Sequence, residues 1–216
     1  MTMQRSISAT LVAGMAIAGL SSGASAHASS QDRRPRGCTI EGTAGDDTLM
    51  GTSGADVICG LRGDDTIRAA GGDDVVYGGR GNDTIFGGNG ADRLYGNGND
   101  DVITGDAGPD VAVGKGGGDR LRGSTGADIL KGGGGADFAR GGDQADRIDG
   151  GKGDDDLAGS GDNDEVTGGA GADRIAGWAG DDALHGTDGV DGNDEVRGAG
   201  GVDTCDADAG DTVSGC

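Results

Sequence analysis

Aromatic residues, proline and histidine are all scarce in this chain of 216 residues. Aromatic residues make up 2% of the sequence, and there are 2 Pro and 2 His. The lack of proline and of a three-residue glycine period excludes a collagen-like triple helix, although the chain holds 52 Gly. His27 lies at an expected processing site and His185 is the other histidine, so no Ser–His or Cys–His pair can be assembled. There is also no GxSxG motif, and the sequence predicts a protein that is not an enzyme.

Basic residues are few as well. Lys+Arg number 17 against Asp+Glu 38, which gives a formal net charge of −21 at pH 7. Nucleic-acid binding needs a basic surface that displaces counterions from phosphates, so the charge balance excludes a nucleic-acid partner. Low hydrophobicity with high net charge is typical of disordered chains, because too little apolar surface is available for burial. The composition alone therefore favours a disordered chain, and a regular repeat would be evidence against disorder.

The sequence has no apolar run long enough to cross a bilayer. Residues 7–20 are largely apolar, but a spanning helix needs roughly 20 such residues. Arg5 precedes this run, and the small residues after it include Ala24-Ser25-Ala26 and Ala26-His27-Ala28, which both fit a cleavage site. We predict a signal peptide over residues 1–26, with cleavage after Ala26 or Ala28, rather than a membrane anchor. The mature chain would then be secreted, with residues 27–37 as an exposed linker and no membrane span.

The four cysteines are Cys38, Cys59, Cys205 and Cys216. An even number of cysteines in an exported chain favours disulfides, and four cysteines allow three pairings. Pairing between neighbours in the sequence would clamp each end of the region between them. A zinc site is the alternative, but the two members of each pair lie too far apart in the sequence for CxxC spacing.

A nine-residue repeat dominates the rest of the chain. From Gly42 to His185 the 144 residues divide into 16 consecutive units of nine without insertion or deletion. With positions counted from Gly42, position 6 is Asp in all 16 units. Position 8 is Leu, Ile or Val except at Ala112 and Ala139, and positions 1 and 4 are almost always Gly. A disordered polyacidic chain has no reason to keep such a register.

Each unit of nine can be interpreted physically. Positions 7 to 9 predict a three-residue strand whose middle side chain faces the interior. Positions 1 to 6 predict a turn, because glycine allows positive φ and close approach of backbone. One apolar residue in each unit cannot form a core alone, so we expect two consecutive units to form one coil that stacks on its neighbours.

The unit GGxGxDxUx, with U a large apolar residue, resembles the calcium-binding nonapeptide of the RTX (repeats-in-toxin) family. Residues 78–86 (GGRGNDTIF), 87–95 (GGNGADRLY) and 168–176 (GGAGADRIA) match it fully. The resemblance implies an all-β fold, a parallel β-roll or solenoid. It also implies several Ca²⁺ ions between adjacent turns, held by position-6 carboxylates and backbone carbonyls. Oxygen donors without imidazole or thiolate independently suit Ca²⁺.

The predicted metal ligands are the position-6 aspartates, which the coil sorts into two ladders. They are Asp47, Asp56, Asp65, Asp74, Asp83, Asp92, Asp101, Asp110, Asp119, Asp128, Asp137, Asp146, Asp155, Asp164, Asp173 and Asp182. Aspartate is also common in turns for local reasons, but that explains a preference rather than its presence in every unit. Pro109, Gln144 and Asp162 depart from the turn pattern, so the turns of Asp110, Asp146 and Asp164 are the weaker candidates.

The pattern defines the domain boundaries. We expect the β-roll over residues 38–206, with regular units over 42–185 and degraded ones over 186–206, followed by a C-terminal cap over 207–216. Gly189-Val190-Asp191 resembles a three-residue insertion, after which residues 193–196 and 202–205 resume the pattern. Additional short strands are expected at residues 39–41 and 211–213.

Two outward aromatic residues, Tyr77 and Tyr95, lie two units apart and should stack as neighbours across strands. A carbohydrate or protein contact is the alternative role for them. For the whole chain we expect a secreted calcium-binding protein that folds on binding Ca²⁺ and has a structural or adhesive role at the cell surface. The alternative is a non-catalytic, calcium-dependent accessory module for an extracellular enzyme.

Overall fold

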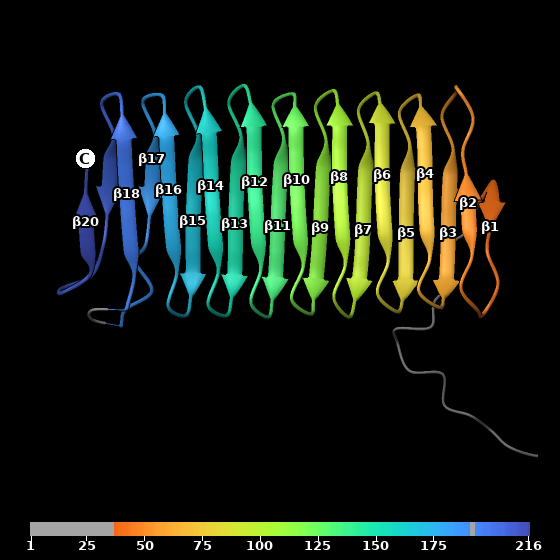
Figure 1. Cartoon of the computed structure of the whole chain (residues 1–216), viewed down its shortest axis with the longest axis horizontal. Helices are drawn as coiled ribbons and strands as arrows, with labels where there is room; N and C mark the ends of the chain where they lie inside the picture. Colours follow the sequence, from red (N-terminus) through yellow and green to blue (C-terminus); the bar gives the residue numbers. More distant parts are fainter. Residues whose placement is uncertain (1–36, 191–192) are drawn as a thin grey trace, which may run out of the picture. The chain divides into compact units, whose positions relative to one another are not determined.

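The computed structural model describes residues 37–190 and 193–216, which form two parallel sheets of ten strands each (Figure 1). Sheet A contains the odd-numbered strands in the order β1 to β19, and sheet B contains the even-numbered strands in the order β2 to β20. Successive strands therefore alternate between the sheets, and one strand from each makes a coil. The described ranges contain no helix, and so none that could cross a membrane. The predicted signal peptide and most of the predicted linker lie outside these ranges.

The strand bounds follow the nine-residue period. Sheet A consists of β1 (Ile40–Glu41), β3 (Val57–Arg62), β5 (Val75–Arg80), β7 (Arg93–Gly98), β9 (Val111–Gly116), β11 (Ile129–Gly134), β13 (Arg147–Lys152), β15 (Glu165–Ala170), β17 (Ala183–His185) and β19 (Thr204–Asp206). Sheet B consists of β2 (Thr48–Met50), β4 (Thr66–Gly71), β6 (Thr84–Asn89), β8 (Val102–Ala107), β10 (Arg120–Thr125), β12 (Phe138–Asp143), β14 (Asp156–Gly161), β16 (Arg174–Ala179), β18 (Glu195–Gly200) and β20 (Thr212–Ser214).

Neighbouring strands within each sheet pair in parallel, and in the regular coils the paired residues lie two units apart. In sheet A, Val57 is paired with Val75 and Tyr77 with Tyr95. The Tyr77 and Tyr95 rings stack with centroids 5.1 Å apart and an interplanar angle of 10°, as predicted. The predicted β-roll with two units of nine per coil is thereby confirmed.

The core is one column of position-8 side chains between the two sheets. Ile85 from sheet B and Leu94 from sheet A are both fully buried in it, and the two small exceptions, Ala112 and Ala139, occupy equivalent places. Ile40 packs against the start of the column. Each buried aliphatic residue contributes about 1.5–3 kcal/mol. Because only one such residue serves each unit, the stack also depends on interactions between its turns.

The prediction of three-residue strands was wrong. Most strands are six residues long, because they continue through positions 1 to 3 of the next unit, and only positions 4 to 6 form the turn. In β3 and β5 the register skips position 1 and resumes with Leu61 beside Gly79. Position 2 has positive φ (85° at Leu61), which shifts the backbone locally while its hydrogen bonds to the neighbouring coils continue.

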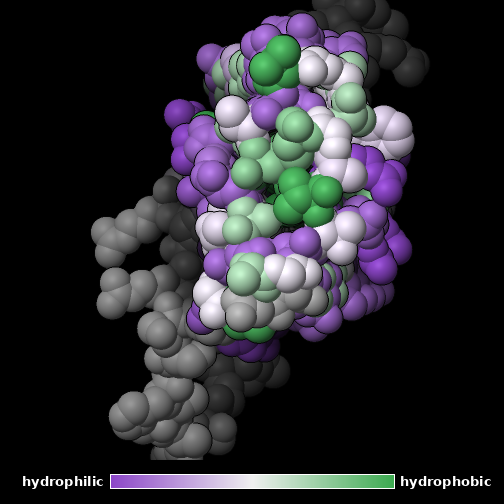
Figure 2. Space-filling model, turned by 90° about the vertical axis from the view of Figure 1, so that its left-hand side faces the viewer, coloured by the Kyte–Doolittle hydropathy of each residue, from purple (hydrophilic) through white to green (hydrophobic). Residues whose placement is uncertain are grey.

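The C-terminal coils show the predicted insertion. Ala183 of β17 pairs with Thr204 of β19, so the chain between them is longer than in a regular coil by the three inserted residues. The expected last strand is present as β20, paired with β18. This end of the stack leaves Val202 79% and Val213 45% exposed, and Figure 2, which faces this end, shows apolar atoms surrounded by hydrophilic ones.

Two disulfides clamp the ends of the stack. Cys38 is bonded to Cys59 of β3, and Cys205 of β19 is bonded to Cys216, with Cα atoms 6.0 Å apart in both pairs. All four cysteines are therefore oxidised, which confirms the disulfide interpretation and removes the zinc alternative. The pairing joins neighbours in the sequence at each end.

Candidate metal centre

The position-6 aspartates form two ladders, one at the start of the strands of each sheet. Each aspartate ends a three-residue turn and directly precedes a strand, so the two-unit coil places alternate aspartates above one another. The ladder of sheet A is Asp56, Asp74, Asp92, Asp110, Asp128, Asp146, Asp164, Asp182 and Asp203. The ladder of sheet B is Asp47, Asp65, Asp83, Asp101, Asp119, Asp137, Asp155, Asp173 and Asp194.

One carboxylate oxygen of each aspartate connects two coils. The backbone N–H of Asp83 donates to Oδ1 of Asp101, and that of Asp92 donates to Oδ1 of Asp110, both at 2.8 Å. The same contact recurs along both ladders at 2.7–3.0 Å. The ladders therefore hold successive turns in register.

The other oxygen, Oδ2, has no hydrogen-bond partner within the described ranges along most of each ladder. This holds for every ladder aspartate from Asp65 to Asp182 and for Asp194 and Asp203. From Asp65 to Asp182 these residues are 0–4% exposed, so bulk solvent does not reach them. Burying a carboxylate oxygen without a partner is strongly unfavourable. The ladders thus require either protons or cations.

The turns themselves provide no counter-charge. Positions 4 to 6 contain no Lys or Arg in any of the 16 units from Gly42 to His185. Burial, followed by the repulsion of neighbouring aspartates, raises the pKa of Asp83 to about 7 and that of Asp101 to about 8. Burial likewise raises the pKa of Asp146 and of Asp164 to about 7. The folded ladders consequently disfavour bare negative charge at neutral pH.

Glycines make room for these carboxylates and for close packing of the turns. A Cβ at Gly78, position 1, would lie 2.3 Å from Oδ2 of Asp83 in the same unit. At position 4, Gly81 has φ of +119°, and a Cβ there would lie 2.1 Å from the carbonyl oxygen of Gly63 in the preceding coil. The turns therefore pack backbone oxygens closely against the next coil, next to the aspartate ladder.

The donor set suits a hard cation. No group of three or more His, Cys, Asp or Glu side chains gathers at one point in residues 37–190 and 193–216. A cation between two coils would therefore have two ladder carboxylates and would complete its shell with backbone carbonyls or water. A set made only of oxygens, with backbone contributions, is what Ca²⁺ accepts at flexible coordination.

The first aspartate of each ladder differs from the rest. Oδ2 of Asp47 accepts hydrogen bonds from the backbone N–H and Oγ1 of Thr43 at 2.6 and 2.9 Å. Oδ2 of Asp56 accepts the same two bonds from Thr52 at 2.7 and 2.9 Å. Asp47 is also only half-buried, and the hydrogen bonds from Thr52 lower the pKa of Asp56. Both carboxylates are satisfied without a cation.

Two ladder members are absent from the sixteen predicted ligands. Asp194 continues the ladder of sheet B, since the N–H of Asp173 donates to its Oδ1 at 2.9 Å. Asp203 continues the ladder of sheet A beyond Asp182 in the same way at 3.0 Å. Both directly precede a strand residue in the degraded units, and extending the position-6 assignment to the units after the insertion would have found them.

The departures from the turn pattern leave the ladder geometry intact. Asn99, Gln144 and Asp162 stand at position 4 with φ of 76°, 77° and 67°, the left-handed region that Asn and Asp tolerate best. Asp110 and Asp146 are buried like the other members. The turns considered weaker candidates thus place their aspartates in the ladders with the same Oδ1 contacts as the regular turns.

Comparison with known families agrees with this geometry. A family model made of four copies of the RTX calcium-binding nonapeptide repeat matches residues 39–67, 51–85, 77–112, 113–148, 132–166, 158–191 and 188–213. Together the matches extend over both ladders, including Asp194 and Asp203. No curated protein sequence matches the chain.

Proposed function

The chain belongs to the family of RTX calcium-binding nonapeptide repeat proteins, and on that premise we propose that its aspartate ladders bind several Ca²⁺ ions and that it folds as they bind. The observation that carries this proposal is the row of buried Oδ2 atoms without a partner, from Asp65 to Asp203. Asp47 and Asp56 also belong to the ladders, but their threonine partners make them the weakest of the predicted ligands.

The coupling of binding to folding follows from where the carboxylates lie. In the unfolded chain each aspartate is hydrated and distant from its ladder neighbours, so water supplies the hydrogen bonds that its carboxylate oxygens accept. In the stack each aspartate is buried, and neighbouring coils are about 4.8 Å apart, one strand spacing. The negative charges of successive aspartates in a ladder therefore repel one another. A divalent cation between two coils supplies the missing charge, and its binding free energy becomes folding free energy.

Circular dichroism tests this proposal directly. We expect a metal-free chain to have little β structure at neutral pH and to gain it cooperatively when millimolar Ca²⁺ is added. Mg²⁺ should be a poor substitute, because it demands stricter octahedral geometry. Equal β content with and without Ca²⁺ would refute the coupling, and calorimetric titration would show independently whether the folded chain binds Ca²⁺.

Beyond calcium, we propose a structural or adhesive role outside the cell. The two disulfides fit an oxidising compartment, and the coil stack presents two broad sheet faces that could hold a partner. We propose no catalytic activity. His185, the histidine of the described ranges, is directed at Asp206, with Nδ1 3.1 Å from its Oδ2, rather than at a nucleophile.

An accessory role to an extracellular enzyme is the second candidate. It shares the calcium-dependent fold but requires a catalytic partner. Calcium-dependent co-purification of a defined hydrolase or epimerase with the chain, with loss of that enzyme's activity in its absence, would favour this role over a structural one.

A further inference from the structure

The outer face of sheet B carries a cluster of arginines that the calcium ladders do not explain. Arg120 and Arg122 extend from β10, and Arg140 extends from β12, where it is paired in register with Arg122. Phe138, 44% exposed, is paired with Arg120 and completes the square. We call these four residues the arginine cluster.

The cluster lacks acidic partners in a chain that has an excess of acids. Within the described ranges, Arg120 and Arg122 make no ion pair or side-chain hydrogen bond, and Arg140 donates only to Oγ of Ser160, at 3.2 Å. No Asp or Glu stands at position 7 or 9 of any strand of sheet B from β2 to β12, and Asp156 of β14 is paired with Phe138 rather than with an arginine. Arg122 and Arg140 lie directly opposite each other, and like charges in that arrangement are destabilising, so an anion bound between them would relieve the repulsion.

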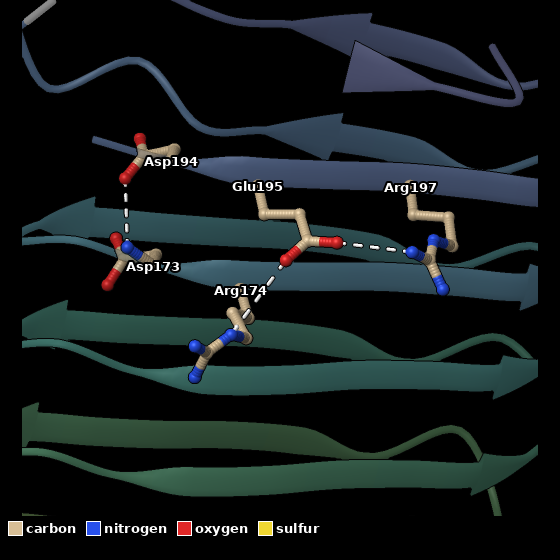
Figure 3. A network of polar contacts seen from close by, with 5 residues as sticks. All are labelled: Asp173, Arg174, Asp194, Glu195 and Arg197. Carbon is tan, nitrogen blue, oxygen red and sulfur yellow. Dashed lines mark hydrogen bonds and ion pairs between the residues drawn. The ribbon is translucent and has the colours of Figure 1, made fainter. Parts of the chain in front are cut away.

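The arginines of the later coils show the contrast. Glu195 of β18 lies between Arg174 and Arg197, at 3.8 and 3.1 Å, and Figure 3 shows these pairs side by side on sheet B. Arg147 likewise pairs with Glu165 at 2.9 Å on sheet A. In these coils the outward arginines are therefore paired with glutamate, whereas the arginines of the arginine cluster have no acidic partner in the described ranges.

The shape of the cluster limits what can occupy it. Its arginines stand at positions 7 and 9, so the basic strip is about 7 Å wide along the strand direction. The acidic turns of the sheet B ladder lie before it, and Asp106 and Asp143 stand near the other ends of β8 and β12. A duplex or a bilayer would bring phosphates against these acids. A thin, extended anionic chain that follows the stack from β12 towards β2 would meet no acidic residue at positions 7 and 9.

We propose that the arginine cluster binds an acidic polysaccharide. Guanidinium groups recognise carboxylates and sulfates through paired hydrogen bonds. The exposed ring of Phe138 offers an apolar surface to the face of a sugar. An acidic peptide fits less well, because peptides usually join a sheet at a free edge, and β10 is already hydrogen-bonded to β8 and β12 on both sides.

The test compares two triple variants of the calcium-loaded chain. Arg120→Gln/Arg122→Gln/Arg140→Gln removes the cluster, and Arg147→Gln/Arg174→Gln/Arg197→Gln removes the same charge from the paired arginines. Fluorescence anisotropy measures binding of labelled heparin and hyaluronan oligosaccharides, which present sulfate and carboxylate groups respectively. Neutral dextran and poly-L-glutamate are the comparison polymers.

We expect at least one of the two glycans to bind the unmodified chain and to bind the cluster variant about ten-fold more weakly or worse. The control variant should change the affinity by less than about two-fold. Circular dichroism in Ca²⁺ checks that both variants fold, and if the triple variant does not, the single Arg122→Gln should show a smaller loss in the same direction. The proposal is wrong if neither glycan binds, if both variants lose equally, or if poly-L-glutamate or dextran binds as tightly as the glycans.

Discussion

The backbone N–H of Asp101 donates a 2.8 Å hydrogen bond to Oδ1 of Asp119, one coil further along the stack. Oδ2 of the same Asp119 side chain is buried and has no partner within the described residues. One carboxylate thus has two separable parts, an oxygen that fixes the register of the coils and an oxygen that is left for a cation. An asparagine can keep the oxygen that fixes the register and remove the oxygen that is left for a cation. The ladder can therefore be tested one residue at a time.

Asp119→Asn should lower the number of bound Ca²⁺ ions. The amide oxygen can still accept from Asp101 N–H, but the other carboxylate oxygen becomes an NH₂ group that repels a cation, and one negative charge is lost. We expect calorimetric titration to show a reduced stoichiometry and circular dichroism to show folding at a higher Ca²⁺ concentration than the unmodified chain.

Asp47→Asn is the matched control at the start of the same ladder. Because Oδ2 of Asp47 is already satisfied by Thr43, this variant should keep the stoichiometry of the unmodified chain. An equal loss of ions from Asp47→Asn and Asp119→Asn would show that the threonine contacts do not replace a cation.

Gly90→Ala should destabilise the calcium-loaded stack by about 1–3 kcal/mol. Gly90 has φ of +136°, and an added Cβ would lie 2.1 Å from the carbonyl oxygen of Gly72. Gly98→Ala is the control, since nothing lies within 4 Å of a Cβ there, and its effect should stay within about 0.5 kcal/mol. Urea unfolding in excess Ca²⁺ measures both. Equal effects of the two substitutions would mean that the turns relax around the new methyl group.

Much of this arrangement could be predicted from the sequence, because one period specifies it. The invariant aspartate and the aliphatic position 8 determine which side chains are buried, and Ile85 and Leu94 lie in the core as expected. The strand length could not be predicted, because glycine is as compatible with the observed continuous pairing as with a long turn. Whether Arg120 and Arg122 have acidic partners depends on which residues lie one coil away on the outer face. The periodic pattern does not constrain that face, so the sequence could not predict it.

The metal-free chain should gain structure as the pH falls. Burial raises the pKa of Asp155 to about 7 and that of Asp119 to about 6, compared with the usual 3.8. A carboxyl whose pKa is higher in the folded state stabilises the fold while it is protonated. This contribution is complete below pH 3.8 and is lost as the pH rises through about 6–8.

Circular dichroism of the metal-free chain between about pH 8 and about pH 5 measures this effect. We expect β content to rise on acidification, and the Ca²⁺ affinity to fall over the same range because protons and cations compete for the same oxygens. Sedimentation should exclude aggregation as the source of the signal. A metal-free chain that stays soluble and equally unstructured at both ends of the range would contradict the prediction.

Removing a terminal disulfide should loosen one end of the stack and leave its middle intact. Cys38→Ser/Cys59→Ser and Cys205→Ser/Cys216→Ser open loops with sequence separations of 21 and 11 residues. Each disulfide is worth on the order of 3 kcal/mol by the chain-entropy model.

Because a coil contacts only its neighbours, the stability of the stack is a sum of local terms. Hydrogen exchange in Ca²⁺ should therefore show lost protection in β1 to β3 for the first variant and in β18 to β20 for the second, with β9 to β12 unchanged in both. Loss of protection along the whole stack from either variant would show that the coils unfold as one cooperative unit and that the clamps act globally.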